Sequence, residues 1–148
     1  MKRVSLRIKD VNKLLEQYKL ELSKKDRVEL LEEKILLVNG TPAFFYHDTH
    51  LVPTLKYLQD HPVLKRVVVD MGAVRFIVSG ADVMRPGVVE IDPEISEEEY
   101  IVIVDVQHKK PLAVGKTLHD GKTMQAMKSG RIIKNIHYVS DDIWNVQL

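Results

Sequence analysis

Residues Val69 to Val88 read V-D-M-G-A-V-R-F-I-V-S-G-A-D-V-M-R-P-G-V, and this stretch decides which fold the chain can adopt. β-Branched and aromatic residues near glycines favour extended backbone, and they occur at Val67, just before the stretch, and at Val69, Val74, Phe76 and Val78 within it. Three glycines mark places where positive φ or a close backbone approach is expected: Gly72, Gly80 and Gly87. Ala81 to Arg85 has the length of one helical turn, which Pro86 would end. The stretch therefore predicts strand, tight turn, short helix, turn and strand.

The same stretch is a candidate for contact with a phosphate backbone. Exposed backbone N–H groups beside basic side chains suit phosphate oxygens, and Arg75 and Arg85 are the basic residues here. The alternative is a well-formed corner of a small barrel that binds nothing, because turn signals alone rarely imply function.

Length and composition narrow the class of protein. The chain has 148 residues, which suffices for one medium domain or two small ones. No apolar run is long enough to span a membrane, and the basic N-terminus lacks the apolar segment of a signal peptide. The absence of cysteine excludes disulfides, thiolate zinc sites and cysteine nucleophiles. We expect a cytoplasmic protein.

Charge is distributed unevenly although the net charge is only +1. Glu90 to Asp105 carries seven acidic residues and no Lys or Arg, whereas Val106 to His137 carries seven Lys or Arg and one acid, Asp120. A locally basic face can attract a polyanion even when the total charge is near zero. Two solvated surfaces of opposite sign remain the alternative.

The first sixty residues predict a small set of elements of their own. Alternation over residues 1–9 indicates a strand, Asp10 is a plausible N-cap, and apolar spacing indicates a helix over residues 11–22. Further strands are expected at 27–32, 35–38 and 41–46, with Asn39-Gly40 as a type I′ hairpin turn. Pro42 suggests an edge strand, and Pro53 can open a helix that runs to about Asp60. We place a domain boundary near 61–64.

The remaining residues are rich in predicted strands. We expect strands at 88–91, 100–107, 112–116, 131–134, 136–139 and 143–148, the last of which would close a barrel. A short helix is expected over Thr123 to Lys128, ending before Gly130.

Four segments resemble a known family. The pattern V-D-x-G-A-x-x-x-V-x-x-G-A-D-V-M-x-P-G-V and the later run N-I-H-Y-V-S-D-D-I-W (Asn135 to Trp144) resemble a PUA domain, an RNA-binding pseudobarrel. V-N-G-T-P-A-F-F-Y (Val38 to Tyr46) and V-P-T-L-K-Y-L-Q-D-H-P (Val52 to Pro62) resemble the pre-PUA domain of the malignant-T-cell-amplified-sequence family, whose front end ligatin shares. The resemblance implies an α+β fold: a small α/β pre-PUA domain over residues 1–63, then a PUA β-pseudobarrel with short helices over residues 64–148.

The resemblance also implies a function. It points to a non-catalytic RNA-binding protein that acts in translation, on the small ribosomal subunit or on tRNA, during initiation, reinitiation or recycling. Eukaryotic members of the family work with a partner that carries an initiation-factor-like domain, so RNA and such a factor are the expected partners. No membrane and no small-molecule substrate are expected.

The candidate RNA contacts come from two sources. PUA domains grip RNA with their first short helix and adjoining strands, which by resemblance singles out Arg75, Gly80, Ala81, Arg85, Pro86 and Gly87. Charge alone adds five residues, since each phosphate neutralised by Lys or Arg contributes salt-sensitive affinity: Lys116, Lys122, Lys128, Arg131 and Lys134.

Other residue groups favour structural roles. His137-Tyr138 could stack on a base, but a core position for Tyr138 is favoured because few aromatic residues are available to fill the core. His47-x-x-His50 lacks a third ligand, so we expect no metal and no cofactor. Dinucleotide-binding, P-loop and nucleophile-elbow motifs are missing, so we expect no enzyme.

Two other functions stay open. The protein could be an adaptor, which an open apolar patch of Phe44, Phe45, Tyr46 and Leu51 would favour. It could also be an accessory subunit of an RNA-modifying enzyme, which co-purification with a catalytic subunit would reveal.

Overall fold

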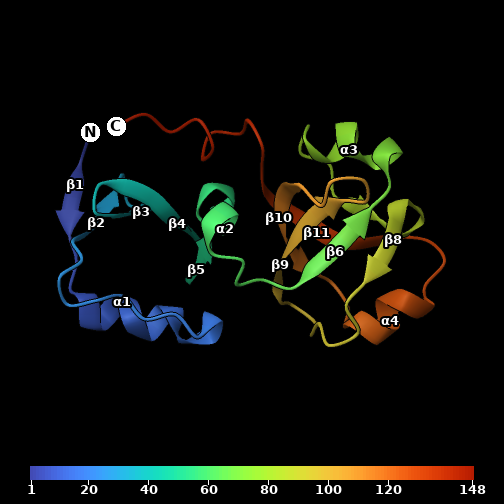
Figure 1. Cartoon of the computed structure of the whole chain (residues 1–148), viewed down its shortest axis with the longest axis horizontal. Coiled ribbons are helices and arrows are strands. Elements are labelled where there is room, and N and C mark those ends of the chain that lie inside the picture. The colour runs from blue at the N-terminus through green and yellow to red at the C-terminus, as the bar shows by residue number, and fades with distance from the viewer. The chain divides into compact units, whose positions relative to one another are not determined.

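The computed structural model describes all 148 residues and divides into two compact units (Figure 1). The first unit contains Met1–Val63 together with Val146–Leu148, and the second contains Leu64–Asn145. Each is built around its own sheet and its own buried apolar residues. No helix has both the length and the apolar character that crossing a membrane would require.

The first unit is an antiparallel five-stranded sheet with two helices. Its elements in chain order are β1 (Arg3–Ser5), α1 (Ile8–Leu15), the 3₁₀ turn η1 (Glu16–Tyr18), β2 (Val28–Leu31), β3 (Ile35–Val38), β4 (Thr41–His47), β5 (His50–Pro53) and α2 (Leu55–Asp60). The strands lie in sequence order, β1-β2-β3-β4-β5. Val11 and Leu15 of α1 pack with Leu36, Phe44 and Leu51 of the sheet. The Asn39-Gly40 hairpin is confirmed, with φ of 53° and 83° at its two central residues.

The first helix begins and ends earlier than its apolar spacing predicts. It spans Ile8–Leu15, so Asp10 lies inside it rather than at its N-cap. Lys19 takes a left-handed conformation with φ of 57°, which ends the helical path after η1. Beyond it, the Asn12 side chain bonds both backbone groups of Leu22 and holds the chain alongside α1.

The expectation that Pro42 marks an edge strand is wrong. β4 pairs with β3 on one side and β5 on the other, so it lies inside the sheet. A register shift between Leu36 and Leu37 opposite Pro42 is the irregularity that accommodates a residue without an N–H. The second partner is β5, a strand that the sequence did not predict and that ends at Pro53, where a helix was expected to open.

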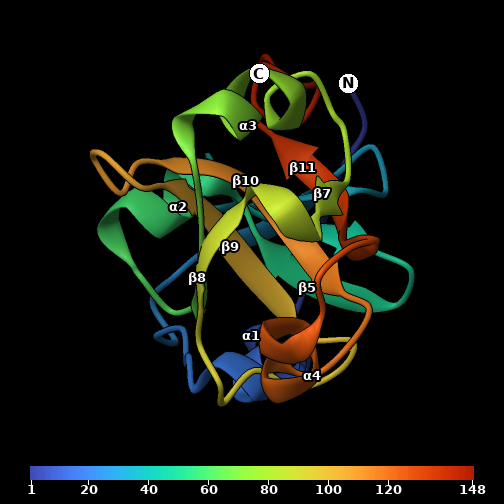
Figure 2. The same cartoon turned by 90° about the vertical axis from the view of Figure 1, so that its right-hand side faces the viewer.

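The second unit is a six-stranded, nearly closed sheet with two short helices. Its elements are β6 (Arg66–Val69), α3 (Met71–Ile77), β7 (Val83–Met84), the 3₁₀ turn η2 (Arg85–Gly87), β8 (Val88–Ile91), β9 (Tyr100–Asp105), β10 (Pro111–Thr117), α4 (Gly121–Ala126) and β11 (Arg131–Tyr138). The strand order is β7-β11-β10-β9-β6-β8, with β6 and β9 parallel and the other pairs antiparallel. Figure 2 shows α3 and α4 at opposite ends of this sheet. The mixed fold with a nearly closed sheet and short helices confirms the predicted α+β class.

The order of helix and strand after β6 differs from the prediction. Val74 and Phe76 lie in helix α3, whereas Ala81 to Arg85 forms a loop and the short strand β7. The Asp70 carboxylate accepts the Ala73 N–H at 2.9 Å, which caps the helix and outweighs the β propensity of Val74. Ile77 is buried in the core, with Ala73 and Val74 packed against it at helical spacing.

The chain end also differs from the prediction, because residues 143–148 form no strand. β11 is one continuous strand, and the chain turns directly after it. Asp141 accepts hydrogen bonds from the backbone N–H groups of Tyr138 and Trp144, and its carboxylate contacts Nδ1 of buried His137 at 2.9 Å. Backbone groups that this carboxylate binds are held in a turn and do not extend into a strand.

Burial alone would raise the pKa of Asp141. The hydrogen bonds from His137 and from the backbone of Trp144 and Tyr138 outweigh burial, and together they hold that pKa below its ordinary value.

Candidate nucleic-acid interface

An apolar groove of about 450 Å³ lies between α3 and the segment 81–87. Its walls come from the start and exposed side of the helix and from the loop, β7 and η2, namely Asp70, Gly72, Ala73, Phe76, Ile77, Ala81, Asp82, Val83, Met84, Pro86 and Gly87. The two sides are joined by the Asp70 N–H, which donates to the Gly87 carbonyl at 3.0 Å. A Cβ on Gly87 would lie 3.2 Å from that of Ala73, so glycine permits this close approach. Three predicted site residues, Ala81, Pro86 and Gly87, are brought together here.

The mouth of the groove carries an aromatic ring and a cation side by side. Phe76 is 54% exposed although it is a large apolar side chain. Met71, close to it in sequence, is 44% exposed, and Met84, which also lines the groove, is 51% exposed. The Arg75 guanidinium lies 4.7 Å from the centroid of the Phe76 ring. Such a pair offers a flat face for a base and a positive charge for a phosphate.

The two carboxylates in the groove are already engaged. Asp70 caps α3, and Asp82 accepts from the Asn135 N–H at 2.8 Å and from Arg131 at 3.0 Å. Asn135 donates in turn to the carbonyls of Ile77 and Ala81, which anchors the loop between α3 and β7. These bonds fix the groove wall and leave its interior largely apolar.

Gly80 lies in the anchored loop and contacts the sheet. Its φ is 96°, and a Cβ added there would lie 3.0 Å from the Tyr138 ring. Tyr138 is half-buried and packs against the core of the second unit. Glycine is therefore required for the loop to close over this ring, and Gly80 supports the groove without lining it.

Arg85 points away from the groove. Its Nε donates to the Met124 carbonyl at 2.8 Å, Nη1 to Val88 at 3.0 Å and Nη2 to Gln125 at 3.4 Å. Two of these carbonyls belong to the last turn of α4, where carbonyl groups without a partner inside the helix attract a positive charge. Arg85 thus connects η2 to α4, a role that the sequence analysis missed because its partners lie about forty residues away in the chain.

The remaining basic candidates are scattered. Arg131 is paired with Asp82 and so adjoins the groove, although its side chain is 55% exposed. Lys116 and Lys134 are directly opposite each other on β10 and β11, and the Lys116 ammonium lies 5.7 Å from the Tyr100 ring centroid. Lys122 lies on α4 and Lys128 follows it, both exposed, at the opposite end from α3 (Figure 2). One continuous basic face therefore does not form around the groove.

Three other predictions from the sequence concern base stacking at His137, metal binding at His47 and His50, and an open apolar patch in the first unit. His137 is fully buried against Asp141, so it offers no face to a base. His47 and His50 face each other across the β4–β5 turn, and no group of three or more metal-ligating side chains occurs anywhere in the chain. Phe44, Phe45 and Leu51 are buried, so the open apolar patch that would favour an adaptor does not exist.

Phe76 and Met84 are the groove residues that sequence reasoning missed. Phe76 was expected in a strand, where an aromatic residue suggests core packing. The Asp70 cap is the signal that could have placed it on a short helix.

Comparison with known proteins finds a family match in each half of the chain. Residues 65–139 match the family model described as PUA domain, and residues 3–61 match one described as Domain of unknown function (DUF1947). The chain belongs to the PUA-domain family. An uncharacterized protein of Methanocaldococcus jannaschii is 42% identical, over 97% of this chain and 96% of its own length.

Relatives of this PUA-domain protein include named eukaryotic proteins. Translation machinery-associated protein 20 of Saccharomyces cerevisiae is 32% identical, covering 90% of this chain and 83% of its own. Malignant T-cell-amplified sequence 1 of Rattus norvegicus is also 32% identical, covering 92% and 84%. The crystal structure of a hypothetical protein of Pyrococcus horikoshii superposes with a TM-score of 0.84 at 33% identity, over 97% of this chain and 98% of that one. The predicted family is confirmed.

Proposed function

We propose that this protein is a non-catalytic RNA-binding protein of translation that acts on the small ribosomal subunit or on tRNA. The proposal is supported by relatives whose names place them with the translation machinery and by the PUA domain over residues 65–139. Within the second unit, which we propose as the RNA-binding domain, the groove between α3 and 81–87 is the contact site. Since ribosomes and tRNA lie in the cytoplasm, we place the protein there as well.

The observation that carries the proposal is the exposed Phe76 ring with the Arg75 guanidinium against it. A phosphate would be repelled by Asp70 and Asp82 inside the groove, so the interior suits the flat apolar face of a base. Arg75, outside the groove, is placed for the phosphate of the same or a neighbouring nucleotide. An unpaired base is required, because bases in a duplex do not expose their faces.

Binding of the purified full chain to isolated small ribosomal subunits and to tRNA tests this function. Co-sedimentation with subunits and fluorescence anisotropy with tRNA, each at increasing salt, give the affinity and its salt dependence. We expect salt-sensitive binding to at least one of the two. Absence of binding to both at low salt would contradict the proposed function.

A further inference from the structure

Positive charge is concentrated in residues 1–27, outside the second unit. Residues 1–27 contain nine Lys or Arg and four Asp or Glu, whereas residues 64–145 contain eleven and twelve. The first stretch therefore carries a net charge of +5 and the second unit a net charge of −1. A protein that binds a polyanion uses local excess, so the N-terminal segment is the stronger source of attraction.

Most of these cations have no partner within the protein. Asp10 lies 4.0 Å from Arg7, and Asp26 accepts hydrogen bonds from Ser23 and Asn39. Only two acidic side chains in the stretch are then left without an ion pair or hydrogen bond, Glu16 and Glu21. Six basic side chains are likewise unpaired: Arg3, Lys9, Lys13, Lys19, Lys24 and Lys25. The surplus of free cations is available to an external anion.

Three of the free lysines line one hollow on the outer side of α1. The hollow has a volume of about 670 Å³ and lies between the helix and residues 21–24. The Asn12 side chain joins the two sides of the hollow. The Leu22 N–H donates to Asn12 Oδ1 at 2.7 Å, and Asn12 Nδ2 donates to the Leu22 carbonyl at 3.2 Å. Lys9 and Lys13, one helical turn apart, and Lys24 on the facing segment line it.

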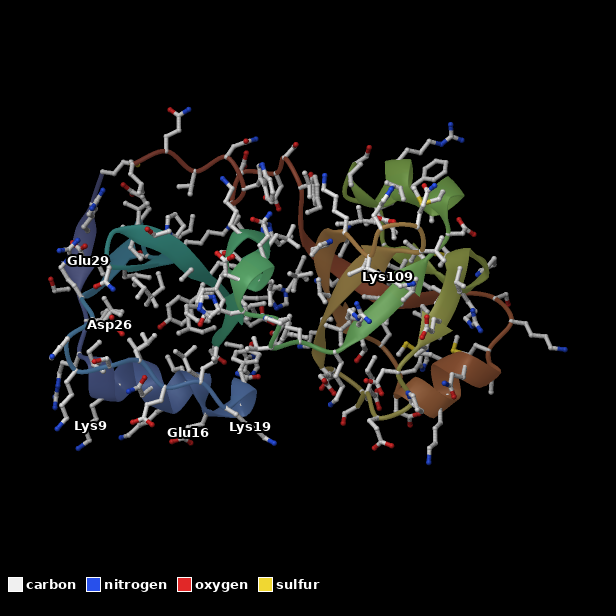
Figure 3. The ribbon with its side chains drawn as sticks, viewed as in Figure 1. Lys9, Glu16, Lys19, Asp26, Glu29 and Lys109 are labelled. Carbon is white, nitrogen blue, oxygen red and sulfur yellow. The ribbon has the colours of Figure 1, made fainter.

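The hollow faces outward, and its charges are unequally placed. Figure 3 shows Lys9, Glu16 and Lys19 on the side of α1 that points away from the sheet. Glu16 follows the last residue of α1, whereas Lys9 lies in its first turn. Glu21 on the facing segment also lines the hollow, so its lining carries three lysines and two glutamates. An anion is therefore favoured beside Lys9 and Lys13 and disfavoured beside Glu16 and Glu21.

We propose that the outer side of α1, with Lys9, Lys13 and Lys24, is a second RNA contact that holds the phosphate backbone without recognising bases. The proposal rests on the proposed function and adds a separate surface to it. The lining includes no aromatic side chain on which a base could stack. Lysine ammonium groups on flexible stems act as point charges, which suits phosphates and carries no sequence information.

The test compares two triple charge reversals of the full chain with wild type. Lys9→Glu/Lys13→Glu/Lys24→Glu alters the hollow, and Lys34→Glu/Lys109→Glu/Lys110→Glu alters three exposed lysines outside it by the same net charge. Affinity is measured across a salt series for whichever of tRNA and small subunits the wild type binds. Circular dichroism and urea unfolding check folding, and the milder Lys9→Gln/Lys13→Gln/Lys24→Gln replaces the first variant if that variant is unfolded.

The expected result is a flatter salt dependence for the hollow variant only. Loss of three phosphate contacts reduces the slope of log K against log salt by about 2 to 3, since each contact contributes roughly 0.7 to 0.9. Equal slopes for the hollow and control variants would overturn the inference while leaving the proposed function intact. Absence of wild-type binding to both RNAs would instead remove the proposed function and this inference with it.

Discussion

Replacement of Phe76 by alanine tests directly whether a base stacks at the groove. The ring is 54% exposed, so less than half of its apolar surface contributes to the folded state. Complete burial of a Phe side chain contributes about 1.5 to 3 kcal/mol, and the loss of stability should be about 1 kcal/mol. Stacking of one base on an aromatic ring contributes about 1 to 3 kcal/mol, which corresponds to roughly a 5- to 150-fold loss of RNA affinity.

The assay is anisotropy or co-sedimentation with the RNA that wild type binds, alongside urea unfolding of each variant. Val89→Ala is the matched control, because Val89 is 56% exposed on β8 and does not line the groove. Phe76→Trp keeps an aromatic face and should retain binding. If Phe76→Ala and Val89→Ala bind RNA equally well, the base does not stack on Phe76 and the groove is not the site.

Three further changes test the structural roles assigned above. Gly80→Ala places a Cβ 3.0 Å from the Tyr138 ring at a φ of 96°, so the free energy of unfolding measured in urea should fall by about 1 to 2 kcal/mol. An unchanged midpoint would show that glycine is not required against this ring. Arg85→Lys keeps the charge but loses the forked contacts, so stability should fall by on the order of 2 kcal/mol while the salt slope of RNA binding stays as in wild type. Because the folded pKa of Asp141 is depressed, its contribution to stability is complete above the unfolded pKa of about 3.9 and is lost as pH falls through the folded value. Asp141→Asn should lack this acid-dependent component when unfolding is measured from about pH 6 down to about pH 2, and an unaltered pH profile would show that the Asp141 carboxylate is not responsible for it.

Local chemistry explains which parts of the fold could be predicted. The Asn39-Gly40 hairpin and the strands around it depend on neighbouring residues, since two positive φ angles in a row require such a pair. Helix α3 was missed because a single capping contact from Asp70 outweighs the strand propensity of Val74 and Phe76. The chain end was missed because the Asp141 side chain captures backbone groups that strand pairing would otherwise use.

The position of the groove could be predicted, but the orientation of its neighbouring arginines could not. Resemblance directs attention to residues 80–88, and Ala81, Pro86 and Gly87 do line the groove. Nothing local indicates that Arg85 donates to α4 carbonyls whereas Arg75 stays exposed beside Phe76. That difference depends on the tertiary placement of α4, which sequence patterning does not determine.

The most direct test of the central claim is the salt dependence of RNA binding by Arg75→Glu beside Arg66→Glu. Both arginines are exposed, belong to the second unit and lie outside the groove lining. Arg75 lies 4.7 Å from the ring centroid of Phe76, which lines the groove, whereas Arg66 begins β6. A groove that places Arg75 on a phosphate predicts that Arg75→Glu weakens binding and lowers the slope of log K against log salt by roughly 0.7 to 0.9, while Arg66→Glu keeps the wild-type slope. Equal effects of the two reversals, or no effect of either, would contradict RNA binding at this groove.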